Sequence, residues 1–565
     1  MSQRAANRRI RLLGVVLALA LAGALAKAAW VQVVQAGSLS EQAQAQQTAA
    51  ITIPASRGSI LDRNGVELAT NNNEAVTIYA DPTLVQKNGS PATESSQAAR
   101  TLGFDSARET ELLRALTVRS SRFTYVERQA PAAAAKALER LKLVGFGFYS
   151  DPKRIYPQGA LAAQVLGYAG VDNRGITGLE LNYNKALSGR SGRQTVVKDP
   201  TTGRIIEVQS SSDGQPGADL ALTIDNVIQL DVQQVLRQTL IDQQARSATA
   251  LVLDARSGAV LAMATAPGYD ANNVPTVPAR YLPNRTVTDT YEPGSTFKLV
   301  TVAGALSDGV VTPQTKFTLP YSIDVAGTPI HDAHPRGSER LTVSEILTLS
   351  SNVGAITISQ RLGKERLARW ISAFGFGKPT GIGFPSESSG IVASPDKWYG
   401  SDAGTIPIGQ GIAVTPIQLA AAYAAIANGG VWVQPRLVER IGGKAAPAPK
   451  KHRVVSPYVA GELMQILRDV VDEGTGTRAE ISGYSVAGKT GTAAKPDPKT
   501  GGYSTYRYVA SFVGIVPASK PRLVILVTVD EPHNSIWGGV AAAPAFKEIA
   551  LDCLRYLEVP PDRTG

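Results

Sequence analysis

Three short motifs follow one another in the second half of this 565-residue chain. They are Ser295-Thr-Phe-Lys298, Ser350-Ser-Asn352 and Lys489-Thr-Gly-Thr492. A serine and a lysine three residues apart lie on one face of a helix, where the amine can take the proton of the hydroxyl. A fold that brings the three motifs to one cleft would form a serine acyl-transfer site without a histidine. This requirement constrains the chain more than any other feature of its sequence.

Single matches to these motifs also occur elsewhere. Ser150-Asp-Pro-Lys153 and Ser394-Pro-Asp-Lys397 repeat the serine–lysine spacing, and Lys499-Thr-Gly501 repeats the third pattern. Proline beside aspartate, with little apolar sequence, is typical of a turn or of a helix start with serine as cap. Ser295 instead begins an apolar run that ends at Gly309, which predicts a helix N-terminus at the serine. Unpaired N–H groups and the helix dipole favour negative charge there, so Ser295 is the predicted nucleophile.

The other two motifs have settings of their own. Ser350-Ser-Asn352 lies between two apolar helical patterns, although alone it would be predicted as a cap or turn. Lys489 begins a run of small residues, which predicts a strand whose edge can pair with a peptide. Strands at 508–516 and 522–529 follow, and a hairpin at 251–264 supplies further strands. Together they predict an antiparallel sheet.

The first 34 residues predict a membrane span. The run from Leu12 to Val34 is apolar, has Lys27 as its sole charged residue, and follows four arginines, namely Arg4, Arg8, Arg9 and Arg11. As a helix it would measure about 34 Å, enough for a hydrocarbon core of about 30 Å. The arginines favour a cytoplasmic N-terminus with the rest of the chain exported. A signal peptide cleaved after Ala26 is the alternative, but the apolar run continues past that residue, so we favour a retained anchor.

Composition narrows the classes of function. The net charge is +10, but lysine and arginine are scattered beyond the N-terminus, so no nucleic-acid partner is predicted. A mild basic excess also suits anionic lipids or an anionic wall. Cys553 is the only cysteine, which excludes an intramolecular disulfide. His331-Asp-Ala-His334 could bind a metal, but a polar loop is favoured, so neither a metal nor a cofactor is predicted.

The order of the three motifs is similar to that of penicillin-binding proteins. Further segments resemble class B members of that family: 57–69, 154–157, 161–170, 178–180 and 222–225. The resemblance therefore covers nearly the whole chain after the apolar segment. Segments 292–298, 474–479 and 486–492 lean toward the division-type, septal members, while the elongation type remains close.

The resemblance implies an α+β transpeptidase fold of the penicillin-binding type. An antiparallel sheet would be flanked by helices and joined by an all-helical lobe, with an elongated N-terminal pedestal. The predicted divisions are a cytoplasmic tail at 1–11, a transmembrane anchor at 12–34, a non-catalytic pedestal or dimerisation-type module at 35–215 and a transpeptidase domain at 216–565. A Ser- and Gly-rich stretch at 209–217 marks the last boundary, and the amphipathic pattern from Asp225 to Gln244 predicts a helix after it. The pattern of residues 75–150 predicts helices at 98–103 and 131–141 in a compact lobe. No catalytic or binding role is assigned to this segment.

The chemistry of the motifs and the resemblance together assign roles. The catalytic residues would be Ser295, Lys298, Ser350, Asn352 and Lys489, with Thr490, Gly491 and Thr492 binding substrate. Lys298 is the predicted general base, because burial and the nearby cation of Lys489 would lower its pKa. By resemblance, the backbone N–H groups of Ser295 and Thr492 would form the oxyanion hole.

The implied function is peptidoglycan D,D-transpeptidation during septal wall synthesis. A stem peptide ending in D-Ala-D-Ala would be the donor, a neighbouring stem peptide would supply the amine, and β-lactams would acylate the same serine. The protein would cross the bacterial cell membrane once, with its catalytic domain outside, and would work with a polytopic glycan polymerase and other division proteins. Alternatives are an elongation-type transpeptidase, a D,D-carboxypeptidase or β-lactamase-like hydrolase, and mainly a scaffold of the division complex. A β-lactam sensor is disfavoured by the short N-terminal tail.

Overall fold

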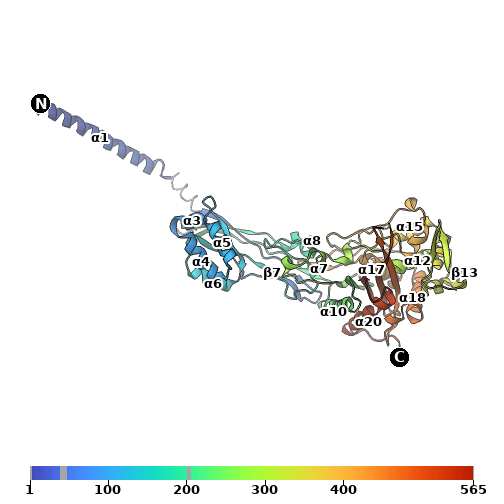
Figure 1. Cartoon of the computed structure of the whole chain (residues 1–565). Coiled ribbons are helices and arrows are strands. Elements are labelled where there is room, and N and C mark those ends of the chain that lie inside the picture. Colours follow the sequence, from blue (N-terminus) through green and yellow to red (C-terminus); the bar gives the residue numbers. More distant parts are fainter. Residues whose placement is uncertain (1–2, 38–47, 200–204, 500, 564–565) are drawn as a thin grey trace. The chain divides into compact units, whose positions relative to one another are not determined.

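The computed structural model describes residues 3–37, 48–199, 205–499 and 501–563, which form two compact units (Figure 1). The smaller unit comprises Met1–Ser56, Asn72–Lys153 and Gly189–Pro216. The larger unit comprises Arg57–Asn71, Arg154–Ser188 and Gly217–Gly565. Residues 57–71 and 154–188, which the sequence placed in the N-terminal module, therefore pack within the larger unit.

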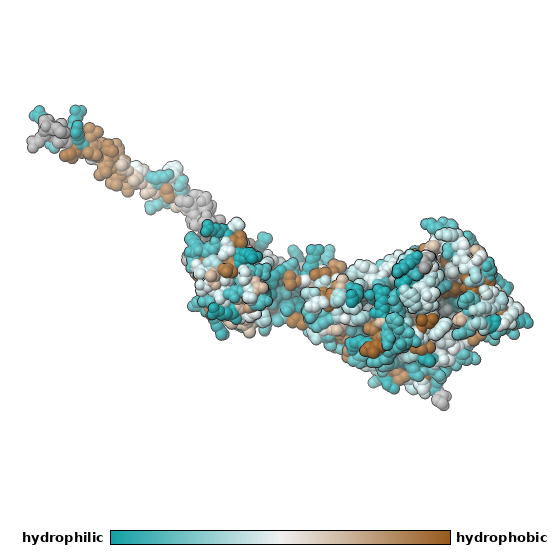
Figure 2. Space-filling view, viewed as in Figure 1, coloured by the Kyte–Doolittle hydropathy of each residue, from teal (hydrophilic) through white to brown (hydrophobic). Residues whose placement is uncertain are grey.

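One helix in the described part of the chain, α1 (Gln3–Val33), is long and apolar enough to cross a membrane. Its apolar stretch runs from Asn7 to Val33, and none of it is buried against the rest of the chain. Figure 2 shows apolar residues over much of the visible face of this helix. The predicted span at 12–34 lies within α1 except for its last residue, Val34, and α1 begins nine residues earlier, at Gln3.

The smaller unit contains two three-stranded antiparallel sheets, in the orders β5-β4-β6 and β1-β8-β9. Its strands are β1 (Thr48–Ile53), β4 (Val76–Ala80), β5 (Thr124–Ala130), β6 (Phe146–Ser150), β8 (Gly192–Lys198) and β9 (Ile205–Ser212). Its other helices are α3 (Pro82–Asn88), α4 (Pro91–Leu102), α5 (Ser106–Leu116) and α6 (Ala132–Arg140). Ile78, Leu116 and Leu138 share one buried core, and Asp81, Ser90 and Asp105 cap α3, α4 and α5. The helices predicted at 98–103 and 131–141 lie within or close to α4 and α6.

The larger unit is built around a five-stranded antiparallel sheet in the order β12-β11-β23-β22-β21. The strands are β11 (Ser247–Asp254), β12 (Val260–Ala266), β21 (Ala487–Asp497), β22 (Gly502–Val516) and β23 (Leu523–Asp530). This confirms the predicted hairpin and the three-strand meander.

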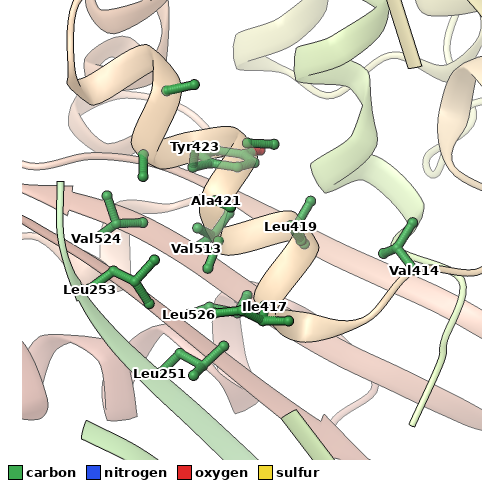
Figure 3. Packing of buried hydrophobic residues seen from close by; sticks show 14 of the residues in the cluster. Leu251, Leu253, Val414, Ile417, Leu419, Ala421, Tyr423, Val513, Val524 and Leu526 are labelled. Atoms are coloured by element: carbon green, nitrogen blue, oxygen red, sulfur yellow. The ribbon is translucent and has the colours of Figure 1, made fainter. Parts of the chain in front are cut away.

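Both faces of this sheet are covered by helices. Successive side chains of a strand point to opposite faces, so neighbouring residues of β11 belong to different cores. Ala250 and Val252 belong to a core with α10 (Asn226–Asp242) and α20 (Ala543–Tyr556). Leu251 and Leu253 belong to the core on the other side. Figure 3 shows Ile417 and Ala421 of α17 (Pro416–Ala427) close to these leucines and to Val524 and Leu526. The predicted helix at 225–244 is confirmed as α10, with Asp225 as its cap.

The lobe between the first and third motifs is mainly helical. Its longer helices are α12 (Lys298–Ser307), α13 (Val343–Thr348), α14 (Asn352–Leu362), α15 (Lys364–Ala373), α17 and α18 (Pro457–Asp472). The prediction of an all-helical lobe is wrong in one respect, because strands pair within it. These are β13 (Lys316–Leu319), β14 (Ser322–Val325), β15 (Thr328–His331), β16 (Glu339–Thr342), β17 (Val431–Val433) and β20 (Lys451–Arg453). Ala326 and Gly327 have positive φ angles of 52° and 81° and form the tight turn of the β14–β15 hairpin.

A second, six-stranded sheet of the larger unit has the order β19-β18-β10-β2-β3-β7. Its strands are β2 (Ile60–Leu61), β3 (Glu67–Asn72), β7 (Lys153–Ile155), β10 (Leu220–Leu222), β18 (Val438–Ile441) and β19 (Lys444–Ala445). Short helices complete the larger unit: α7 (Ala163–Leu166), α8 (Gly178–Asn182), α9 (Asn184–Leu187), α11 (Arg285–Thr288), α16 (Asp402–Thr405) and α19 (Gly538–Ala541). Its 3-10 turns are η1 (Val274–Thr276), η2 (Ala279–Tyr281), η3 (Gly294–Phe297), η4 (Pro395–Lys397), η5 (Ile406–Ile408) and η6 (Thr477–Ala479).

A buried ion cluster joins the two early segments of this unit to each other. Arg57 Nε donates to Glu180 Oε2 at 2.6 Å, and Arg154 Nε donates to Glu180 Oε1 at 2.7 Å. Arg57 and Glu180 side chains have 0% exposure. Arg57 also donates to the carbonyl of Glu180 and to the side chains of Asn184 and Ser188. These bonds join segments 57–71 and 154–188 to each other. Other bonds join them to the rest of the larger unit: the N–H of Ala162 donates to Gln233 Oε1 at 2.9 Å, and the N–H of Asn226 donates to Asp62 Oδ2 at 3.2 Å.

Candidate active site

Ser295 lies in the 3-10 turn η3, which leads directly into α12. The turn is fixed on α17, because Tyr423 Oη donates to the carbonyl oxygen of Thr296 at 2.7 Å. Gly294 has a φ of +54°, and a Cβ there would lie 2.8 Å from the carbonyl oxygen of Thr492. Glycine is therefore needed at this position to let the nucleophile turn approach β21.

Lys298 is the first residue of α12 and is completely buried. Its Nζ donates to the carbonyl oxygen of Ser350 at 2.6 Å and to Asn352 Oδ1 at 2.7 Å, and Ser350 Oγ lies 3.3 Å away. Burial lowers the pKa of Lys298 to about 7, although the negative charge of Asp332 acts in the opposite direction. A substantial fraction of this amine is therefore neutral near pH 7, as a general base requires.

Lys489 on β21 is also completely buried, and its Nζ lies 3.3 Å from the carbonyl oxygen of Thr490. Burial and the charge of Lys298 hold the pKa of Lys489 well below its ordinary value. Burial is the largest cause of the lowered pKa of both lysines, and the charge of Lys298 lowers the pKa of Lys489 further.

The three motifs meet at one cleft of about 520 Å³. Among the predicted site residues, its lining includes Ser295, Ser350, Asn352, Thr490 and Thr492. Lys298 reaches this group through its hydrogen bonds, while Lys489 and Gly491 belong to the same stretch of β21 as the two threonines. His331, His334, Arg478, Tyr508 and Trp537 also line the cleft. The cleft therefore combines hydroxyl, amide and cationic groups with an aromatic wall.

Strand β21 lies at the edge of the five-stranded sheet, which leaves one side for an extended peptide. Gly491 is packed tightly, since a Cβ there would lie 2.9 Å from the carbonyl oxygen of Pro293. Thr490 Oγ1 is 2.7 Å from Thr475 Oγ1, and Thr492 Oγ1 accepts from the N–H of Gly538 at 3.2 Å. These contacts fix the two threonine hydroxyls that face the cleft.

Sequence reasoning missed Asp332, which had been grouped with His331 and His334 in a polar loop. Asp332 is buried and accepts hydrogen bonds from Ser351 Oγ and from the backbone N–H of Asn352, at 3.0 and 2.6 Å. It lies 19 residues before Ser351 in a segment with no recognisable motif, so the sequence offered no signal for this contact. The ring of His334 lies 5.8 Å from that of Trp537 at the cleft.

Two family models match the chain. The penicillin binding protein transpeptidase domain matches residues 248–551, and the penicillin-binding protein dimerisation domain matches residues 52–222. The first match contains all three motifs. The second ends at Leu222, within β10.

Relatives are similar over nearly the full length. The peptidoglycan D,D-transpeptidase FtsI of Escherichia coli K12 is 34% identical over 547 residues, which cover 96% of this chain and 91% of the relative. The stage V sporulation protein D of Bacillus subtilis is 34% identical over 94% of this chain and 83% of its own length.

Solved structures agree with these matches. Penicillin binding protein 3 of Mycobacterium tuberculosis has a TM-score of 0.71 at 31% identity, and the match covers 91% of this chain and 98% of that one. A peptidoglycan synthetase of Bifidobacterium adolescentis has a TM-score of 0.74 at 28% identity, covering 92% and 98%. The α+β transpeptidase fold is thereby confirmed. With a transpeptidase domain, a dimerisation domain and full-length relatives of this kind, the chain belongs to the class B penicillin-binding proteins.

Proposed function

We propose that this chain is a peptidoglycan D,D-transpeptidase that acts through an acyl-enzyme on Ser295. The observation that carries the proposal is the buried amine of Lys298, bonded to Ser350 and Asn352 at a cleft that Ser295 also lines. Relatives named as D,D-transpeptidases support the reaction. Structures of the mycobacterial relative complexed with aztreonam and ampicillin support β-lactams as ligands of this cleft.

In the first half-reaction, a donor stem peptide ending in D-Ala-D-Ala lies along the edge of β21. The neutral amine of Lys298 takes the proton of Ser295 Oγ, which attacks the penultimate carbonyl carbon. The backbone N–H groups of Ser295 and Thr492 stabilise the oxyanion. The C–N bond then breaks, Ser350 relays a proton to the leaving amine, and D-Ala departs.

In the second half-reaction, the amine of a neighbouring stem peptide attacks the ester carbonyl carbon. The bond from this carbon to Ser295 Oγ breaks, the serine oxygen regains a proton that the amine gives up, and the cross-link is formed. Asn352 holds the substrate amide and orients Lys298. Before D-Ala departs, the terminal carboxylate of the donor is held by Lys489, Thr490 and Thr492, and the tight backbone at Gly491 lets the donor peptide pair closely with β21. A substrate carboxylate beside Lys489 also restores the charge of this lysine, since an anion nearby raises the pKa of an amine.

We assign the chain's parts on the same basis. Residues 1–11 form a cytoplasmic tail, 12–34 a single-pass anchor, 35–215 a non-catalytic module and 216–565 the exported transpeptidase domain. Apolar α1, preceded by arginines, supports this topology. A polytopic glycan polymerase is the proposed partner in the membrane.

The proposed place of action is the septum, supported by segments 292–298, 474–479 and 486–492. Depletion of the protein in its host is therefore expected to block division while growth continues. Phase-contrast microscopy of depleted cells tests this role. Filaments support the septal assignment, whereas rounded or swollen cells would favour the elongation type.

The rate of acylation is expected to rise with pH through a midpoint near 7. Only the neutral amine of Lys298 can accept the proton of Ser295, and burial lowers the pKa of this lysine to about 7. Below the midpoint the lysine is protonated, so acylation slows about tenfold for each pH unit. The second-order rate constant with a fluorescent penicillin, measured against pH, gives the midpoint. A midpoint near the ordinary lysine pKa of about 10.4 would contradict the assignment of the base.

Product analysis tests the transpeptidase itself. The full-length protein in detergent is incubated with a donor peptide ending in D-Ala-D-Ala and an amine acceptor, and the products are separated by mass spectrometry. Cross-linked product with release of D-Ala supports the proposal. Hydrolysed donor alone, together with rapid turnover of a penicillin, would indicate a carboxypeptidase or lactamase. If neither a cross-linked or hydrolysed product nor a penicillin adduct forms, the scaffold role is the remaining alternative.

A further inference from the structure

Asp332 caps a helix that belongs to another segment of the chain. It follows strand β15, and its Oδ1 accepts from the backbone N–H groups of Asn352 at 2.6 Å and Val353 at 3.0 Å. These are the first residues of α14, whose N–H groups have no partners within the helix. Ser351 Oγ donates to the same carboxylate at 3.0 Å. The second motif is therefore held by a carboxylate from outside it.

Three further hydrogen bonds fix this carboxylate and the motif. Arg336 donates to Asp332 Oδ2 through Nη2 at 2.6 Å and through Nε at 3.0 Å. The amide Nδ2 of Asn352 donates to the carbonyl oxygen of His331 at 2.9 Å. Asp332 is 6% exposed, so this charge pair is largely removed from water, where it is not screened as a surface pair would be.

The same motif supplies the acceptors of the Lys298 amine. Ser350 has a φ of +62°, a backbone conformation that is uncommon for residues other than glycine. Its carbonyl oxygen accepts a hydrogen bond from Lys298. Asn352 Oδ1 accepts from the same amine. Ser351, between these two residues, is anchored by Asp332. The direction of both acceptors thus depends on the anchor.

We propose that Asp332 is a positioning residue for acylation: it holds Ser350 and Asn352 against the Lys298 amine, and Arg336 holds Asp332 in place. The inference rests on the acylation of Ser295 proposed above. It assigns a role in the reaction to the β14–β15 hairpin region, which carries none of the three motifs.

The charges around Lys298 predict the direction in which each substitution moves the pKa of this lysine. Asp332 raises the pKa of Lys298 against the effect of burial. Arg336 pairs with Asp332, and Lys489 approaches from β21. His331 and His334 line the same cleft, and neither is substituted in the variants described below. Removing the carboxylate therefore makes Lys298 lose its proton at lower pH, whereas removing the guanidinium of Arg336 has the opposite effect.

The test uses full-length protein in detergent and the second-order rate constant for acylation by a fluorescent penicillin, measured over about pH 5–9. Asp332→Asn is expected to move the midpoint to lower pH and to reduce the plateau rate about tenfold or more. Arg336→Gln is expected to move the midpoint to higher pH. The double variant is expected to return the midpoint toward that of the unchanged protein. Asp324→Asn, at the exposed turn of the same hairpin, is the matched control and should leave both quantities unchanged.

A merely structural role would not produce opposite shifts. Shifts of the same sign in Asp332→Asn and Arg336→Gln, or an unchanged profile in Asp332→Asn, would overturn the proposal. If Asp332→Asn does not fold, as judged by its melting temperature, Arg336→Gln decides alone: an upward shift supports the inference and its absence overturns it. Absence of any adduct on the unchanged protein would instead reject the acylation itself.

Discussion

Ser295→Ala is expected to abolish the covalent penicillin adduct and to lower cross-linking by at least about 10⁴-fold. The variant keeps the cleft and the Lys298 amine but has no oxygen to form the ester. Its small side chain fits the half-buried position in η3, so the fold is preserved. Mass spectrometry of the intact protein after penicillin treatment, with peptide mapping of the unchanged protein, measures the effect.

Ser394→Ala is the matched control, because Ser394-Pro-Asp-Lys397 repeats the serine–lysine spacing. In the structure Ser394 is exposed and precedes the 3-10 turn η4 (Pro395–Lys397). This variant should form the adduct at the rate of the unchanged protein. An adduct on Ser295→Ala, or its loss in Ser394→Ala, would contradict the assignment of the nucleophile.

Arg57→Met is expected to lower the free energy of unfolding by about 3–5 kcal/mol. The substitution leaves the carboxylate of Glu180 buried with Arg154 as its remaining ionic partner. It also removes donors from Asn184, Ser188 and the carbonyl oxygen of Glu180. Removing one partner of a buried pair costs far more than the pair itself contributes, since the other charge stays desolvated.

Chemical denaturation followed by tryptophan fluorescence measures this loss, with Arg63→Met as control. Arg63 lies in the turn between β2 and β3 and is exposed. A surface substitution of this kind is expected to change the free energy of unfolding by no more than about 0.5 kcal/mol. A change below about 1 kcal/mol in Arg57→Met would show that the buried cluster does not secure the early segments.

Local pattern was sufficient for the elements that carry the chemistry. The apolar run after Ser295 predicted α12, and Asp225 before an amphipathic stretch predicted α10. Alternating and apolar strands predicted the five-stranded antiparallel sheet. These features depend on side-chain periodicity and on capping residues within a few positions, so they are readable from neighbouring residues alone.

Contacts between distant segments could not be read in this way. The buried bonds of Arg57 to Glu180 join positions 123 residues apart, and they hold two early segments of the larger unit together. The strands β14 and β15 interrupt a lobe that the resemblance implied to be all-helical. Short strands of four residues depend on the pairing partner for stability, so their own sequence carries little signal.

The sequence by itself determined the three motifs, their order and which side chains within a motif share a face, because spacing along a helix or strand fixes that face. The cleft where the motifs meet depends on the tertiary fold. Only the tertiary structure decided the electrostatics of that cleft. Burial lowers the pKa of Lys298, burial and the charge of Lys298 lower that of Lys489, and Asp332, which follows strand β15, holds the second motif. Desolvation and charge–charge interactions depend on distances in space, which residue spacing along the chain does not contain.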